Sequence, residues 1–147
     1  MLKNSEKMKQ LVFTTTLVLA VLISACDNPN DAGYNTEFTI QLAHSIKTTD
    51  SRYIIRFDSI MTDSRCPEGA QCFWAGTAGT KFTLSENNEK PVTFDLYIPD
   101  YPHLNWNKTF IYKNIKIELL QLIPYPSLNS DKNSKPYKAT VRLTRID

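Results

Sequence analysis

The stretch that decides the fold is Asp63-Ser64-Arg65-Cys66-Pro67-Glu68-Gly69-Ala70-Gln71-Cys72-Phe73-Trp74-Ala75-Gly76. Two cysteines enclose five residues, and Pro67 and Gly69 among these allow the backbone to turn tightly enough for the sulfurs to meet. The segments on either side carry strand patterns. The stretch therefore predicts a short loop between two strands, closed by a disulfide between Cys66 and Cys72.

Two other uses of this cysteine pair are less favoured. A zinc site needs three or four ligands, and the two distant histidines, His44 and His103, do not complete one, so we expect no bound metal. A redox dithiol usually has Cys-x-x-Cys spacing, which this loop lacks. As a structural crosslink, a loop of this size would stabilise the fold by roughly 2.4 kcal/mol in the chain-entropy model.

Trp74 lies two residues after Cys72. On a strand, both side chains would point to the same face, which predicts that the indole packs beside the disulfide as part of the core. The alternative is an exposed aromatic side chain that contacts a ligand.

The N-terminus has the pattern of an export signal. Residues 1–10 are polar and carry three lysines, and residues 11–25 are apolar apart from Thr14, Thr15, Thr16 and Ser24. This apolar run is shorter than the roughly 20 residues that a spanning helix needs, and it matches a secretory signal. The run ends in Ile23-Ser24-Ala25-Cys26.

These four residues resemble the lipobox of bacterial lipoproteins. The resemblance implies that residues 1–25 are a cleaved signal peptide and that Cys26 receives a diacylglycerol and a further acyl chain such as palmitate. Two or more chains hold a protein durably at a membrane, whereas one does not. The expected location is the bacterial cell envelope, inner or outer membrane, with the domain outside the cytoplasm. Ordinary cleavage nearby, which would leave Cys26 as a free thiol, is the alternative.

Charge and composition limit the partners. The formal charge of the chain is +2, and Lys3, Lys7 and Lys9 against Glu6 supply all of it. The remainder is about neutral, so we expect no nucleic-acid partner. Residues 26–35 are polar and contain proline and glycine, which predicts a lipidated tether.

Period-two alternation of apolar residues recurs along residues 36–147 and predicts six to eight short strands. The expected strands lie at 37–42, 52–60, 72–85 (one bent strand or two), 91–98, 108–123 (divided at Asn114) and 137–146. This pattern predicts an all-β fold, an antiparallel immunoglobulin-like sandwich with a local disulfide. The Asp63–Gly76 stretch, with residues 117–126 and 137–141, is similar to segments of small uncharacterised secreted or lipid-anchored bacterial proteins. That resemblance implies a β-domain and brings no established activity.

Two long connections, residues 99–107 and 124–136, are candidate binding loops because loops at the ends of sandwiches often carry function. Tyr101, Trp106 and Tyr125 have the rings to stack on a sugar or a peptide, and Asn105 has the amide to hydrogen-bond it. The alternative is that these side chains plug the open end of the sandwich.

No catalytic constellation and no cofactor-binding motif is recognisable. The sequence therefore predicts a lipid-anchored, non-enzymatic binding or structural module, with a protein or a glycan as ligand. A second hypothesis is a protease inhibitor that offers the stapled loop Arg65–Gln71 as a rigid bait, because rigidity lowers the entropy lost on binding. An envelope enzyme is a third, less favoured hypothesis.

Overall fold

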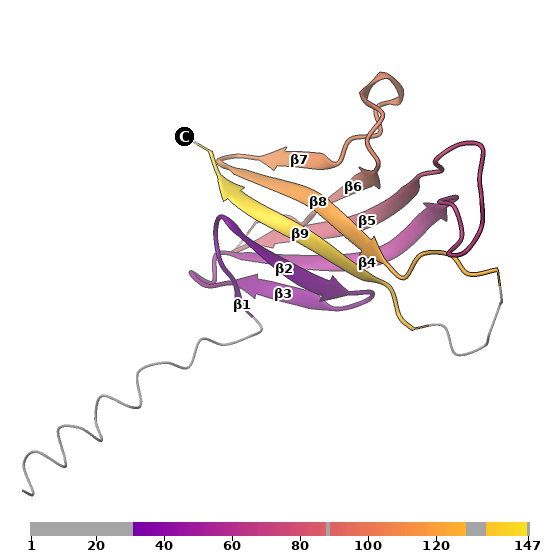
Figure 1. The fold of residues 1–147 in the computed structure, drawn as a ribbon. Coiled ribbons are helices and arrows are strands. Elements are labelled where there is room, and N and C mark those ends of the chain that lie inside the picture. The colour runs from indigo at the N-terminus through magenta and orange to yellow at the C-terminus, as the bar shows by residue number, and fades with distance from the viewer. Residues whose placement is uncertain (1–30, 88, 129–134, 147) are drawn as a thin grey trace, which may run out of the picture.

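The computed structural model describes residues 31–87, 89–128 and 135–146. The predicted signal peptide and Cys26 lie outside these residues. The chain forms two sheets packed face to face, as Figure 1 shows, and the predicted antiparallel sandwich is confirmed. No helix in the described part is long and apolar enough to cross a membrane.

The first sheet has five strands in the order β1-β3-β4-β5-β6. Their bounds are β1 Asp31–Ala32, β3 Ser45–Thr48, β4 Tyr53–Asp63, β5 Ala78–Glu86 and β6 Val92–Ile98. The second sheet has four strands in the order β2-β9-β8-β7. Their bounds are β2 Thr36–Gln41, β9 Lys138–Arg145, β8 Ile115–Ile123 and β7 Thr109–Tyr112. Every pairing is antiparallel except that of β1 with β3.

Alternation places the apolar side chains of each strand in the space between the sheets. β4 buries Tyr53, Ile55 and Phe57, while Ile54 and Arg56 between them are exposed. The other fully buried large side chains are Phe82, Leu84, Leu96, Ile115, Ile117, Leu119, Leu122, Val141 and Leu143. Burial of a side chain of this size contributes about 1.5–3 kcal/mol, so this layer is the main source of stability.

A row of stacked phenylalanine rings crosses the core and joins the two sheets at one edge. Phe57, Phe82 and Phe94 stand side by side on β4, β5 and β6, with ring centroids 5.0 and 5.7 Å apart. Phe94 stacks in turn on Phe110 of β7 at 4.0 Å. Because β7 belongs to the second sheet, this contact fastens the two edges together.

Several elements differ from the sequence prediction. β1 and β3 were not predicted, because two and four residues are too short for a periodic signal. β1 also lies within residues 26–35, the predicted tether, and its Ala32 is fully buried. The division at Asn114 is confirmed, since Lys113 and Asn114 form the turn between β7 and β8. β5 begins at Ala78 rather than at Cys72, so the preceding residues belong to the loop.

A polar network closes the end of the sandwich at which β1 lies. Asp50, in the turn between β3 and β4, accepts hydrogen bonds from the hydroxyls of Thr48 (2.6 Å) and Tyr34 (2.8 Å) and from the Arg52 amide (3.1 Å). It also pairs with Arg145 at 3.0 Å. Partial burial opposes ionisation, but these hydrogen bonds and the positive charge outweigh it and lower the pKa of Asp50 to about 2.

Asp50 should therefore make stability depend on pH in an acidic window. Because its pKa is lower in the folded state than in the unfolded state, its stabilisation is present above pH 3.8 and is lost as the pH falls towards 2. We expect the free energy of unfolding of Asp50→Asn at pH 6 to be about 1 kcal/mol lower than that of the wild type. This figure is smaller than the pKa shift alone would give, because solvent screens the charge. Urea titrations of both proteins at pH 6 and pH 2 measure this difference. The same difference in the free energy of unfolding at pH 6 and at pH 2 would show that the ionised Asp50 carboxylate is not the cause.

Candidate functional site

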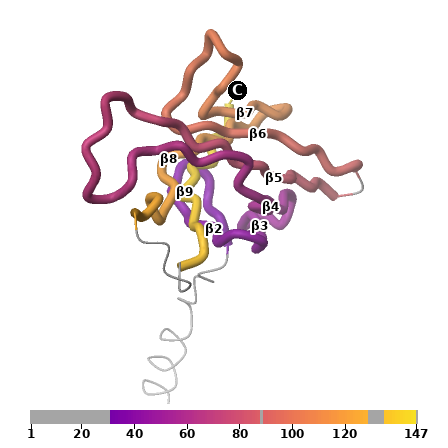
Figure 2. The backbone as a smooth tube through the Cα atoms, turned by 90° about the vertical axis from the view of Figure 1, so that its right-hand side faces the viewer, coloured from indigo at the N-terminus to yellow at the C-terminus, as the bar shows by residue number. Residues whose placement is uncertain are grey.

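The loop between β4 and β5, residues 64–77, is named the cysteine loop here. Its Cys66–Cys72 disulfide is present, with the two Cα atoms 5.9 Å apart, which confirms the predicted crosslink. Figure 2 looks onto the end of the sandwich that carries this loop (magenta, at left), with the 99–107 loop (orange) above it. β1 lies at the other end, where it pairs with the residues of β3 that lie beside the start of β4.

Arg65 holds the first half of the cysteine loop to the second sheet. Its side chain is 6% exposed and forms a two-point ion pair with Asp63, at 2.8 and 2.7 Å. Its other donors reach the carbonyl oxygens of Leu122 and Pro124 at the end of β8. Burial disfavours the charged form, but the contacts with Asp63 outweigh it and raise the pKa of Arg65, which therefore stays protonated.

Ser64 and Thr77 tie the two ends of the cysteine loop together. The Ser64 amide donates to the Thr77 carbonyl oxygen at 2.9 Å, and the Ser64 hydroxyl lies 3.1 Å from both the Thr77 carbonyl oxygen and its amide nitrogen. Gly76 passes so close to this junction that an added Cβ would lie 1.6 Å from the Ser64 carbonyl oxygen. A residue with a side chain does not fit at this position.

The middle of the loop attaches to the segment that follows β8, residues 124–128. The Glu68 amide donates to the Pro126 carbonyl oxygen at 2.9 Å, and Glu68 forms an isolated bridge with Ser127. Together with Arg65 and the disulfide, these bonds connect the loop to the sandwich at several points along its length. We infer that its backbone is held in one conformation.

Phe73 and Trp74, named the aromatic tip, lie on this fixed loop with their side chains in solvent. Phe73 is 101% exposed and Trp74 is 75% exposed. The prediction that Trp74 packs in the core is therefore wrong. It assumed a strand from Cys72 onward, whereas β5 starts at Ala78 and the intervening backbone does not alternate as a strand does.

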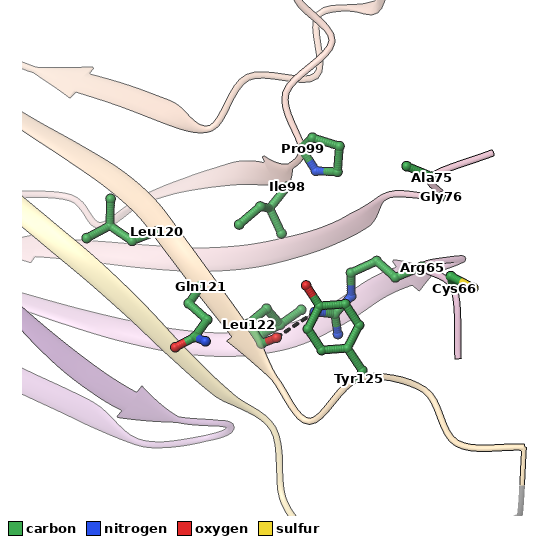
Figure 3. Close-up of a pocket in the computed structure, with 10 residues that line it drawn as sticks. All are labelled: Arg65, Cys66, Ala75, Gly76, Ile98, Pro99, Leu120, Gln121, Leu122 and Tyr125. Atoms are coloured by element: carbon green, nitrogen blue, oxygen red, sulfur yellow. Dashed lines mark hydrogen bonds between the residues drawn. The ribbon is translucent and has the colours of Figure 1, made fainter. Parts of the chain in front are cut away.

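A cleft of about 380 Å³ opens between the cysteine loop and the ends of β6 and β8 (Figure 3). It is lined by Arg65, Cys66, Ala75, Gly76, Ile98, Pro99, Leu120, Gln121, Leu122 and Tyr125. Arg65 is the one charged residue in this lining, and Asp63 and two backbone carbonyls already occupy its guanidinium. The walls of the cleft are therefore mainly apolar and present no unpaired charge.

Tyr125 forms one rim of the cleft. Its ring lies over the Arg65 guanidinium, 4.3 Å from the ring centroid, and is 49% exposed. Tyr125 also lines a second cleft of about 370 Å³, together with Glu68, Ile123, Pro124, Lys135, Pro136 and Lys138. Of the four predicted ligand-contacting residues, Tyr125 lines both of these clefts, and Tyr101, Asn105 and Trp106 line neither of the two.

The other three predicted residues belong to the 99–107 loop, whose residues contact one another and β6. The ring of Trp106 stacks on Tyr97 of β6 at 5.4 Å and meets Tyr101 edge-on at 6.3 Å. Asn105 has a left-handed backbone (φ 58°) where the short 3₁₀ helix Pro102–Leu104 ends, a conformation that asparagine tolerates. The Tyr101 hydroxyl lies 3.4 Å from the Ala75 carbonyl oxygen, which brings this loop beside the cysteine loop.

The burial of Arg65 bears on the protease-inhibitor hypothesis. A bait loop must offer its specificity side chain to the protease, and this guanidinium faces inward. The exposed part of the stapled loop is Glu68–Gly69 and Gln71.

Among the described residues, no group of three or more histidine, cysteine or acidic side chains is placed to hold a metal ion.

Sequence reasoning missed the cleft, and it considered an exposed Trp74 as the alternative to a buried one. Ile98 and Leu120 read as ordinary strand residues and Pro99 as the start of a loop, and their shared location depends on how the two sheets stack. The hydrophobic pair Phe73–Trp74 beside a proline- and glycine-containing loop was the available signal for the tip.

Comparisons with protein-family models, curated proteins and solved structures give no match to this chain.

Proposed function

We propose that this chain is a lipid-anchored protein of the bacterial cell envelope whose sandwich is a non-enzymatic binding module. The binding site is the aromatic tip together with the cleft beside it. The observation that carries the proposal is the exposure of Phe73 and Trp74 on a loop fixed by Arg65 and a disulfide. Apolar rings kept in water at a fixed position are typical of interaction sites.

The position of the tip fits an anchor at the N-terminus. β1 pairs with the end of β3, which lies beside the start of β4, and the cysteine loop leaves the end of β4. β4 has eleven residues, and at about 3.3 Å per residue it spans roughly 35 Å. A domain tethered through Cys26 would thus present the tip away from its own membrane.

The anchor is tested by intact mass spectrometry and fractionation of the protein from the cells that produce it. We expect cleavage before Cys26, the added mass of the acyl chains, and recovery with membranes. Cys26→Ser should abolish all three. A variant that still fractionates with membranes, with no mass change beyond the substitution, would refute lipid attachment.

The binding site is tested by photo-crosslinking in the same cells. A photoreactive phenylalanine analogue is placed at position 74 and, as a control, at position 111, where Ile111 is 61% exposed on β7 at a different place on the surface. We expect a discrete adduct from position 74 and none from position 111. Absence of any adduct at position 74 would refute a binding role for the aromatic tip.

A further inference from the structure

We infer that the ligand is a segment of another protein that presents a large apolar side chain next to a carboxylate. The apolar side chain would enter the 380 Å³ cleft, and the carboxylate would lie against Lys135 and Lys138. This inference rests on the proposed function, because it names the chemical class of ligand for the same site.

Exposed apolar side chains concentrate on the cysteine loop and on the segment from Ile123 to Leu128. Among the residues that the structure describes, nine large apolar side chains are exposed, and five of them are Phe73, Trp74, Ile123, Tyr125 and Leu128. A hydrogen bond from Glu68 to Pro126 and a bridge between Glu68 and Ser127 join the two segments that carry these five. The five therefore lie on two segments that are held together. Aromatic residues around a charge-poor pocket are the composition of the centre of a protein–protein interface.

The groups inside the cleft favour an apolar protein side chain over a sugar. A sugar ring brings several hydroxyls, and each one buried without a partner costs free energy. Four of the five N–H donors of Arg65 are already used by Asp63, Leu122 and Pro124. The polar side chains left in the lining are those of Gln121 and Tyr125, too few to satisfy a sugar.

The charge of the second cleft indicates which group the ligand carries next to its apolar side chain. Lys135 and Lys138 are exposed in the second cleft, and neither forms an ion pair with a described residue. Glu68 lines the same cleft, so the three side chains together carry one net positive charge. A carboxylate beside the apolar side chain complements this charge, and a lysine there would be repelled.

Three labelled twelve-residue peptides test the inference by fluorescence anisotropy on the full-length protein isolated from cells. Each has a central Leu-Phe pair, flanked by aspartates, by serines or by lysines. We expect the aspartate peptide to bind about tenfold more tightly than the lysine peptide, with the serine peptide between them. Raising the salt concentration should reduce the difference in affinity between the aspartate and the lysine peptide.

Variants locate the two contacts. Trp74→Ala should weaken binding of the aspartate peptide by about tenfold or more without unfolding the protein, because the side chain is 75% exposed. The double variant Lys135→Glu, Lys138→Glu should reverse the order of the peptides. Ile111→Ala, which removes an exposed apolar side chain away from the clefts, should change nothing.

Three outcomes would overturn the inference: no binding of any peptide, equal binding of all three, or binding that Trp74→Ala leaves unchanged. A glycan array that captures the wild type but not Trp74→Ala, or self-association abolished by Trp74→Ala, would also overturn it. These two results would leave the proposed binding role in place. The absence of any crosslink at position 74 would remove the proposed function itself.

Discussion

Replacing Arg65 with methionine should lower the free energy of unfolding by about 3–5 kcal/mol. The change leaves the Asp63 carboxylate, whose side chain is 7% exposed, without its charged partner. The Tyr137 hydroxyl at 3.0 Å and the backbone amide of residue 65 at 3.3 Å would still donate to that carboxylate, but these neutral donors do not neutralise a buried charge. The variant also removes the bonds to Leu122 and Pro124 that hold the cysteine loop to β8. Urea unfolding followed by circular dichroism measures the change.

The matched control is the exposed ion pair between Lys81 and Asp95 on β5 and β6, whose side chains are 41% and 38% exposed. Lys81→Met should change stability by no more than about 1 kcal/mol, since water screens this pair. The combination of Arg65→Met with Asp63→Leu should recover part of the loss, because no buried charge then lacks a partner. Equal effects of Arg65→Met and Lys81→Met would show that the Asp63–Arg65 pair does not fasten the loop.

Gly76→Ala should destabilise the sandwich by at least about 3 kcal/mol, the upper end of the range for overpacked sites. The new methyl group would lie 1.6 Å from the carbonyl oxygen of Ser64 and 2.9 Å from the amide nitrogen of Arg65. Both are backbone atoms, so no side-chain rotation relieves the clash. The loop would have to separate from the Ser64–Thr77 junction, and thermal unfolding of the purified variant should report the loss.

Gly69, inside the disulfide ring of the same loop, provides the comparison. Its φ is +82°, and no atom lies within 4 Å of an added Cβ. Gly69→Ala should therefore cost only the backbone strain of a left-handed residue, about 1–2 kcal/mol. If Gly69→Ala lost more stability than Gly76→Ala, the close approach of the Ser64 backbone would not be the reason for glycine at position 76.

Much of the fold could be predicted because the signals for it are local. Alternation predicted β2, β4, β6, β8 and β9 to within a few residues. The disulfide joins residues six positions apart, and proline and glycine in its ring indicate the turn. The break at Asn114 was visible as a polar residue between two apolar runs.

The candidate site was predicted less well. Tyr101, Asn105 and Trp106 were chosen because they are aromatic or polar and lie in a long loop, which is also the composition of a loop that packs on itself. Trp106 lies against Tyr97 of β6, a contact between residues nine positions apart that alternation does not reveal. Lipid attachment at Cys26 and a non-enzymatic binding role stay predictions.

The sequence by itself determined the strand pattern and the covalent ring of the cysteine loop, because each depends on residues close together in the chain, and the number and spacing of those strands indicated the antiparallel sandwich. The tertiary structure decided which way the side chains of that loop face. Arg65 turns inward because its partners Leu122 and Pro124, 57 and 59 positions later, end a strand of the opposite sheet. With Arg65 and Gly76 holding the loop against the sandwich, Phe73 and Trp74 are left in solvent, and the cleft lies between the loop and the two sheets.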